Sequence, residues 1–193
     1  MPSPRRRGTK ARPRGRTRSR RQARIPIAGP IRIVFLDLDG TLTDGVIVFD
    51  TVGDQRNFFI RDGLALQWAR ERGVLPVVIS GRGSRAAELR MADLELEHYL
   101  DVRDKVAVAE RVMAREGVSW KECVMVGDDL PDMAMLERAG WAVAVADAVG
   151  EVVAAAHWVT TKPAGRGAVR EVMERVLKHN GLWQSVLDHY EVK

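Results

Sequence analysis

The stretch that decides the fold is residues 31–45, which read IRIVFLDLDGTLTDG. Residues 31–36 form an apolar run interrupted only by Arg32, and such a run is typical of a parallel strand covered on both faces. The acidic residues Asp37 and Asp39 follow directly, and Gly40 comes after them. The stretch therefore predicts a buried strand that ends in an acidic loop.

Strands and helices alternate along the rest of the chain. Residues 46–50 and 55–60 flank a turn at Gly53 and predict a β-hairpin inserted after the first strand. Further strands are predicted at residues 74–80, 123–126, 142–145 and 158–160. Helices are predicted from about residue 62 to Gly73, and over residues 85–94, 105–116, 131–139, 151–155 and 168–179. This order predicts an α/β fold in which helices cover both faces of a parallel sheet.

Charge divides the chain into two unequal parts. Residues 1–24 contain 11 of the 31 Lys and Arg residues and no acidic residue, which leaves 20 basic against 26 acidic residues, a net charge of −6, in residues 25–193. With so few apolar side chains, residues 1–24 are expected to form a disordered basic tail. The tail could attract nucleic acid, but a solvated extension is the favoured interpretation.

The hydropathy pattern argues against a location in a membrane and against secretion. No apolar run approaches the ~20 residues that a membrane helix requires, so we expect no membrane association. Residues 1–24 also lack the apolar centre of a secretory signal, and we expect a cytoplasmic protein.

Polar residues gather where three of the predicted strands end. Carboxyl ends of neighbouring parallel strands share one edge of the sheet, and ligands bind beyond that edge. The residues at these ends are Asp37, Asp39, Ser80, Gly81, Asp128 and Asp129, with Asp132 just beyond them and Lys105 at the start of a helix. We therefore expect their side chains to converge on one site.

The carboxylates in this set predict phosphoryl transfer. Asp37 and Asp39 lean to the same side of an extended chain, and their repulsion is relieved if a cation neutralises one and the other keeps a proton. With Asp128 they form an all-oxygen site that suits Mg²⁺. Asp37 would attack phosphorus to form an aspartyl phosphate, and Asp39 would act as general acid and then general base. Ser80 and Lys105 would bind the phosphoryl oxygens.

Taken together, the motifs resemble those of the haloacid dehalogenase superfamily of phosphatases. The matching segments are residues 37–41 (DLDGT), 80–82 (SGR), Lys105 and residues 127–132 (GDDLPD), within a similarity that spans about residues 31–178. The resemblance implies a Rossmann-like fold, with Asp37 as nucleophile and Asp39 as acid/base. The phosphate-binding residues that it implies are Ser80, Gly81 and Lys105.

The same resemblance implies a magnesium site. Its ligands would be the carboxylates of Asp37 and Asp128 and the backbone carbonyl of Asp39. Asp129 and Asp132 would lie just outside this ligand set and support it, directly or through water.

The spacing of the motifs predicts that no cap domain covers the site. Only 42 residues (38–79) separate Asp37 from Ser80, and only 22 (106–127) separate Lys105 from Asp128. We expect a phosphatase domain at residues 25–181 and a C-terminal extension at residues 182–193 that packs as a short helix.

Among capless members, the chain is similar to the 3-deoxy-D-manno-octulosonate 8-phosphate phosphatases. The features that carry this similarity are residues 37–45 (DLDGTLTDG), 61–63 (RDG), 80–82 (SGR), 104–105 (DK) and 165–171 (GRGAVRE). The resemblance implies a small sugar-acid phosphate as substrate and a homotetramer joined through the hairpin. The chain departs from the family at residues 99–103, where a Gln-Gly pair is usual, and a nonulosonate 9-phosphate is an alternative substrate.

Three arginines are candidates for recognising the carboxylate of a sugar acid, because a guanidinium group pairs with it through two hydrogen bonds. They are Arg61, Arg82 and Arg166, of which Arg82 is favoured because it follows a motif at the sheet edge. Each could instead form a surface or interface ion pair.

Two functions of other classes remain open. A polynucleotide 3′-phosphatase directed by the basic tail would use the same chemistry. A non-enzymatic receiver-like module also has an acidic pocket on an α/β sheet, but its order of residues differs, because here Ser80 and Lys105 precede the second acidic cluster.

Overall fold

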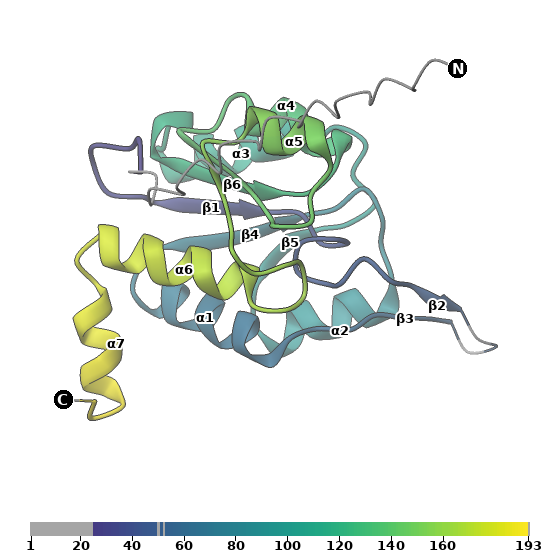
Figure 1. Cartoon of the computed structure of the whole chain (residues 1–193), viewed down its shortest axis with the longest axis horizontal. Helices are drawn as coiled ribbons and strands as arrows, with labels where there is room; N and C mark the ends of the chain where they lie inside the picture. Colours follow the sequence, from purple (N-terminus) through teal and green to yellow (C-terminus); the bar gives the residue numbers. More distant parts are fainter. Residues whose placement is uncertain (1–24, 50, 52, 193) are drawn as a thin grey trace, which may run out of the picture.

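The computed structural model describes residues 25–49, 51 and 53–192. Its centre is a six-stranded sheet in the order β5-β4-β1-β6-β7-β8, with every neighbouring pair parallel (Figure 1). The strands are β1 (Ile33–Leu36), β4 (Leu75–Ile79), β5 (Glu97–Tyr99), β6 (Cys123–Gly127), β7 (Trp141–Ala144) and β8 (Trp158–Val159). The sheet confirms the predicted parallel α/β architecture.

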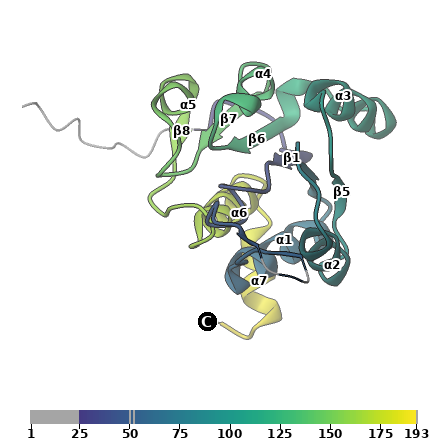
Figure 2. The same ribbon diagram turned by 90° about the vertical axis from the view of Figure 1, so that its right-hand side faces the viewer.

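Helices cover the sheet on both faces, as the alternating pattern predicted (Figure 2). One face carries α1 (Ile60–Glu71), α2 (Arg85–Asp93), α6 (Ala168–His179) and α7 (Trp183–His189). The other face carries α3 (Lys105–Glu116), α4 (Met133–Leu136) and α5 (Gly150–Ala155). Short 3₁₀ turns, η1 (Trp120–Glu122) and η2 (Leu130–Asp132), precede β6 and α4.

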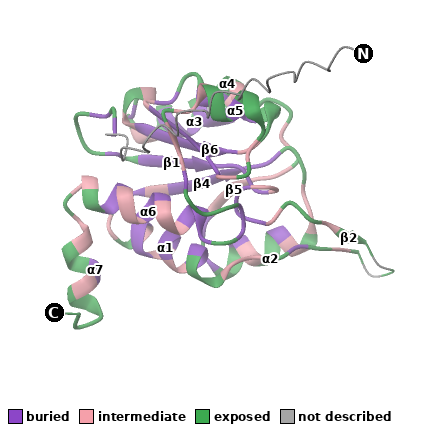
Figure 3. Ribbon diagram, viewed as in Figure 1, coloured by how far each residue is buried: buried purple, intermediate pink, exposed green. Residues whose placement is uncertain are grey.

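The first predicted strand lies in the middle of the sheet and supplies side chains to both cores. Val34 and Leu36 pack in the core beneath α1 and α6, whereas Ile33 and Phe35 pack in the core beneath α3 and α4. All four residues are at most 1% exposed, and Figure 3 shows the strands at the centre of the sheet in the colour of buried residues. Burial on both faces explains why this strand is apolar at successive positions rather than at alternate ones.

The predicted hairpin is present but shorter than expected. β2 (Val48–Phe49) pairs antiparallel with β3 (Asp54–Gln55), and an isolated bridge joins Thr43 to Phe58 nearer the sheet. The second strand was expected to reach residue 60, but α1 begins there, because the backbone N–H groups of Asp62 and Gly63 donate to the carbonyl of Phe59.

Two other elements differ from the prediction, and one helix agrees with it at both ends. The strand β5 was not predicted, because its three residues are half-buried and form no apolar run. The helix predicted at residues 131–139 is the 3₁₀ turn η2 followed by only four α-helical residues in α4. The helix at residues 105–116 is confirmed at both ends, by the Asp104 side chain that caps its start and by Gly117 at φ +62° after its end.

The C-terminal extension forms the predicted short helix, α7, and packs on α1. Trp183 meets Trp68 edge to face at a centroid distance of 5.9 Å, and Val186 is 1% exposed. The Trp68 indole N–H donates to the Tyr190 hydroxyl at 3.0 Å. The predicted disordered tail, residues 1–24, lies outside the described residues. Across the part of the chain that the structure describes, no helix has the length and apolar character to cross a membrane.

Candidate active site

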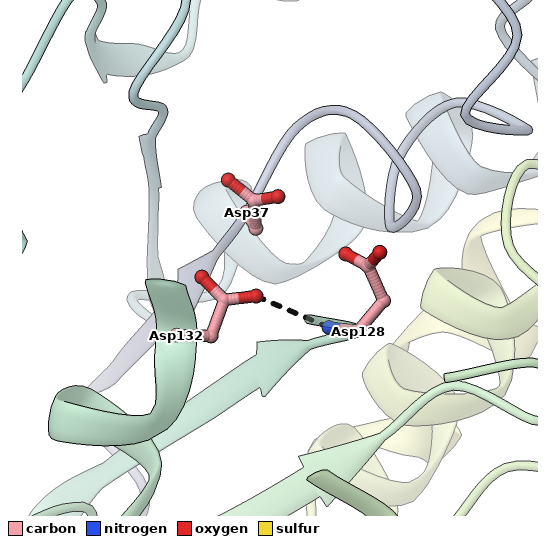
Figure 4. A group of neighbouring side chains, drawn as sticks. All are labelled: Asp37, Asp128 and Asp132. Carbon is pink, nitrogen blue, oxygen red and sulfur yellow. Dashed lines mark hydrogen bonds between the residues drawn. The ribbon is translucent and has the colours of Figure 1, made fainter. Parts of the chain in front are cut away.

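Three carboxylates converge at the carboxyl ends of the two central strands. Asp37 directly follows β1, Asp128 directly follows β6, and the Asp37 backbone N–H donates to the carbonyl of Val126 at 3.1 Å. Oxygens of Asp37, Asp128 and Asp132 lie within 4.8 Å of one another (Figure 4). The convergence expected from the sequence is therefore present for these three residues.

Lys105 joins this cluster from the start of α3. Its Nζ lies 2.6 Å from Oδ1 of Asp37 and 2.8 Å from Oδ1 of Asp132. The Asp104 carboxylate accepts a hydrogen bond from the backbone N–H of Ala107 at 3.0 Å and so fixes where the helix begins. Lys105 was predicted to bind phosphoryl oxygens, and in this structure its ammonium group lies directly against the predicted nucleophile.

The electrostatics of the cluster favour an added cation. Burial, and then repulsion by Asp132, raise the pKa of Asp37 to about 6 although Lys105 acts in the opposite direction. Burial, and then the charges of Asp37 and Asp132, raise the pKa of Asp128 to about 7. Three carboxylates face one ammonium group, so the site lacks positive charge. An all-oxygen set with this deficit fits Mg²⁺ better than a softer metal.

The loop after β1 is shaped around Asp128. Gly40 has φ +88°, and a Cβ added there would lie 2.2 Å from Oδ2 of Asp128. The Thr41 hydroxyl donates to Oδ1 of the same carboxylate at 3.1 Å. Glycine is required at this position both by its backbone conformation and by the approach of the carboxylate.

Asp129 and Asp132 occupy different places, although the sequence grouped them. Oδ2 of Asp132 accepts a hydrogen bond from the backbone N–H of Asp128 at 3.1 Å, and the residue is 1% exposed. Asp129 is exposed, and its Oδ1 accepts from the backbone N–H of Leu130 at 2.7 Å. Asp132 therefore belongs to the cluster, while Asp129 caps η2.

Asp39 pairs with a residue that the sequence did not single out. The Arg56 Nε lies 2.7 Å from Oδ1 of Asp39, and its Nη2 lies 3.1 Å from Oδ2. The hydrogen bond to Asp39 raises the pKa of the Arg56 guanidinium. An arginine in a polar hairpin usually points to solvent, so the pattern carried no sign that this one is buried.

Two of the predicted phosphate-binding residues, Ser80 and Gly81, directly follow β4, the strand beside β1, whereas Lys105 begins α3. Ser80 follows β4, is 2% exposed, and accepts a hydrogen bond at Oγ from the backbone N–H of Arg82 at 3.2 Å. A cavity of about 410 Å³ lies next to it, lined by Gly81, Val102, Arg103, Asp104, Lys105, Val106, Pro131, Ala134 and Met135. This cavity offers space for an organic group beside Lys105.

The three predicted substrate arginines are all exposed. Arg61 lies over the ring of Phe59 at 6.0 Å, and Nη2 of Arg166 lies 3.7 Å from Oδ2 of Asp44. Arg82 follows Gly81, which lines the cavity. Their role in binding a carboxylate stays a prediction.

Comparisons with known proteins identify the family of this chain. Residues 101–173 match the family described as haloacid dehalogenase-like hydrolases. The chain is 35% identical over 159 residues to the 3-deoxy-D-manno-octulosonate 8-phosphate phosphatase of Escherichia coli strain K12, a match that covers 81% of this chain and 85% of that protein.

Solved structures give the same family. One is the 3-deoxy-D-manno-octulosonate 8-phosphate phosphatase of Moraxella catarrhalis in complex with magnesium ion, phosphate ion and KDO, with a TM-score of 0.79 and 30% identity over 83% of this chain and 93% of that one. Another is the cobalt-bound deoxy-D-mannose-octulosonate 8-phosphate phosphatase of Haemophilus influenzae, with a TM-score of 0.76 and 32% identity over 79% and 91%. This chain therefore belongs to the haloacid dehalogenase-like hydrolases and, among them, to the 3-deoxy-D-manno-octulosonate 8-phosphate phosphatase family.

Proposed function

We propose that this chain is a magnesium-dependent phosphomonoesterase that hydrolyses 3-deoxy-D-manno-octulosonate 8-phosphate through an aspartyl phosphate. The observation that carries the proposal is the meeting of Asp37, Asp128 and Asp132 with Lys105 at the carboxyl ends of β1 and β6. The 35% identity to a phosphatase with this substrate supports the choice of sugar acid.

In the first half of the reaction, a carboxylate oxygen of Asp37 attacks phosphorus. The new Asp37–phosphorus bond forms as the ester bond between phosphorus and the sugar oxygen breaks. Asp39, protonated at this stage, gives its proton to the departing oxygen, so that the sugar acid leaves as an alcohol. Lys105 and Ser80 stabilise the charge on the phosphoryl oxygens.

In the second half, water attacks the phosphorus of the aspartyl phosphate. Asp39 accepts a proton from that water, and the bond between phosphorus and Asp37 breaks. Inorganic phosphate leaves, Asp37 is again a carboxylate, and Asp39 is again protonated. The two halves therefore return both residues to their starting states.

Mg²⁺ would be held by the carboxylates of Asp37 and Asp128 with the carbonyl of Asp39, and it would screen the repulsion between carboxylate and phosphate. Asp132 would support this set by fixing the backbone N–H of Asp128 and the ammonium group of Lys105. Asp129 would lie outside it.

The hairpin supports a proposal about assembly. Val46, Val48 and Phe49 are 54%, 50% and 73% exposed, and a two-stranded ribbon is rarely stable alone. We infer that these side chains pack against other subunits of a homotetramer and help to enclose each site, since the described chain has only the hairpin, α1 and β4 between Asp37 and Ser80. Light scattering at micromolar concentration tests this, and a fully active monomer would contradict it.

The test of function is a hydrolysis panel with Mg²⁺ and with EDTA. It contains 3-deoxy-D-manno-octulosonate 8-phosphate, a nonulosonate 9-phosphate, p-nitrophenyl phosphate and an oligonucleotide 3′-phosphate. We expect the octulosonate to give the highest kcat/KM, with EDTA abolishing turnover. Arg82→Met, Arg61→Met and Arg166→Met then report which arginine binds the carboxylate, through a raised KM for the sugar acid but not for p-nitrophenyl phosphate. If kcat/KM is instead highest for the nonulosonate 9-phosphate or for the oligonucleotide 3′-phosphate, that ester replaces the octulosonate as the proposed substrate.

A further inference from the structure

Arg56 is buried between two carboxylates, and each of its three guanidinium nitrogens donates a hydrogen bond to one of them. Its side chain is 0% exposed, whereas the side chains of Asp39 and Asp54 are 22% and 17% exposed. Nε and Nη2 donate to the two oxygens of Asp39 at 2.7 and 3.1 Å, and Nη1 donates to Oδ2 of Asp54 at 2.5 Å. Withdrawing a guanidinium group from water costs free energy unless such partners replace the water.

We propose that Arg56 is a positioning residue for Asp39, an inference that rests on the acid/base role of Asp39 proposed above. Two parallel hydrogen bonds from one planar group fix both the direction and the plane of the carboxylate. Asp39 follows the buried Leu38 and precedes Gly40, and no hydrogen bond from any other described side chain to its carboxylate is observed. Arg56 therefore determines where this carboxyl group points.

The hairpin in turn determines where Arg56 lies. Arg56 directly follows β3, in which Asp54 pairs with Phe49. The bridge between Thr43 and Phe58 then ties the same segment to the loop after β1. Asp54 accepts a hydrogen bond from the remaining nitrogen of the guanidinium. The paired hairpin strands therefore hold Arg56 in place, and Arg56 in turn holds Asp39.

Positioning of an acid predicts an effect that depends on the leaving group. An alkoxide leaves only with a proton, whereas p-nitrophenolate leaves without one. The value of kcat/KM reports the steps up to departure of the leaving group. It therefore compares an ester that needs a proton from Asp39 with one that does not. A small misplacement of a catalytic group costs about 10²-fold in rate. A residue that only supported the fold would lower kcat/KM for both esters alike.

The experiment compares kcat/KM for p-nitrophenyl phosphate with that for the alkyl phosphate that the wild-type chain hydrolyses fastest. We expect Arg56→Met to lower the alkyl value by about 10²-fold and the aryl value by less than about 10-fold. Arg56→Lys, which keeps the charge but not the two parallel donors, should recover part of the alkyl loss. Asp54→Asn should produce a smaller loss with the same preference.

Arg115→Met is the matched control, since Arg115 also binds both oxygens of one carboxylate, that of Glu97, at 2.9 and 2.7 Å but at the far end of α3. It should leave both values unchanged. Thermal unfolding shows whether each variant is folded. If Arg56→Met does not fold, Arg56→Lys is used to compare kcat/KM for the two esters. Equal losses for the two esters, or a change in KM alone, would overturn the inference. A wild-type chain that hydrolyses neither ester would contradict the proposed function itself.

Discussion

The Lys105 ammonium group lies 2.6 Å from a carboxylate oxygen of Asp37, in a site where both residues are less than 10% exposed. Because Lys105 also contacts Asp132, replacing it leaves two buried carboxylates without their cation. We expect Lys105→Met to lower the free energy of unfolding of the metal-free protein by about 3 kcal/mol and kcat/KM by about 10²-fold or more. Denaturant unfolding and initial rates measure the two effects. Lys121→Met, at an exposed position, serves as control and should change neither.

Asp37→Asn should separate stability from activity. Burial raises the pKa of Asp37 to about 6. Above that pH the carboxylate is ionised, and its charge lowers the stability of the folded metal-free protein. A neutral amide of the same shape removes that cost, and we expect a higher Tm in EDTA at about pH 8. Turnover of p-nitrophenyl phosphate should be abolished together with the acid-stable phosphate label on the protein. Retained turnover would contradict Asp37 as nucleophile.

Magnesium should stabilise the protein more at high pH than at low pH. The pKa values of Asp37 and Asp128 are raised from 3.8 to about 6 and about 7, first by burial and then by repulsion, from Asp132 on Asp37 and from Asp37 and Asp132 on Asp128. A group whose pKa is higher in the folded than in the unfolded state stabilises the fold when protonated, and this contribution is lost as pH rises through the folded value.

The metal-free Tm should therefore fall from about pH 4, near the unfolded pKa values, to about pH 8, above the folded ones. We expect the difference in Tm between excess Mg²⁺ and EDTA to be larger by about 5 °C or more at pH 8 than at pH 6. Asp128→Asn should reduce this dependence on pH. A difference that did not change with pH would show that the carboxylates are not the groups that respond to the metal.

Gly40→Ala should weaken the metal site. An added Cβ would meet Oδ2 of Asp128 at 2.2 Å, and φ of +88° is unfavourable for alanine. We expect the Mg²⁺ concentration for half-maximal activity to rise by about 10-fold or more. Gly150→Ala is the control, because a Cβ at the start of α5 meets nothing within 4 Å, and it should leave the Mg²⁺ requirement unchanged. An unaltered requirement in Gly40→Ala would rule out this steric argument.

Removal of residues 182–193 should lower stability while leaving the chemistry in place. The deletion takes away the buried Val186 and the ring of Trp183, and it exposes Trp68 on α1. We expect the free energy of unfolding to fall by at least about 2 kcal/mol. At a temperature where both proteins are folded, kcat should agree within about twofold. A large loss of kcat would show that α7 belongs to the functional domain rather than to an extension.

The sequence predicted those features whose causes are local. α3 was placed correctly at both ends because Asp104 and Gly117, which start and stop it, are neighbours of the helix in the chain. Three members of the acidic cluster were found because each directly follows a strand or lies a few residues beyond one. The site could therefore be predicted from the order of strands and helices in the chain, without knowledge of any contact between them.

Features that depend on distant contacts were missed. The burial of Arg56 requires Asp39 to approach from 17 positions away in the chain, and nothing in the composition of the hairpin indicates that approach. The strand β5 exists because it adds to β4, although its own three residues are only half-buried. Similarly, the segment expected to be a helix over residues 131–139 is a 3₁₀ turn followed by four α-helical residues, and its Asp132 contacts Lys105 from another helix.

The ribbon that carries Arg56 also offers a way to inhibit the enzyme. Its exposed side chains Val48 and Phe49, which we propose pack against other subunits, do not line the cavity beside Lys105. A small molecule that bound between the ribbon and the loop after β1 would move Arg56 away from Asp39, the proposed proton donor, and leave that cavity unchanged. Such a compound would reduce turnover without being displaced by high concentrations of substrate.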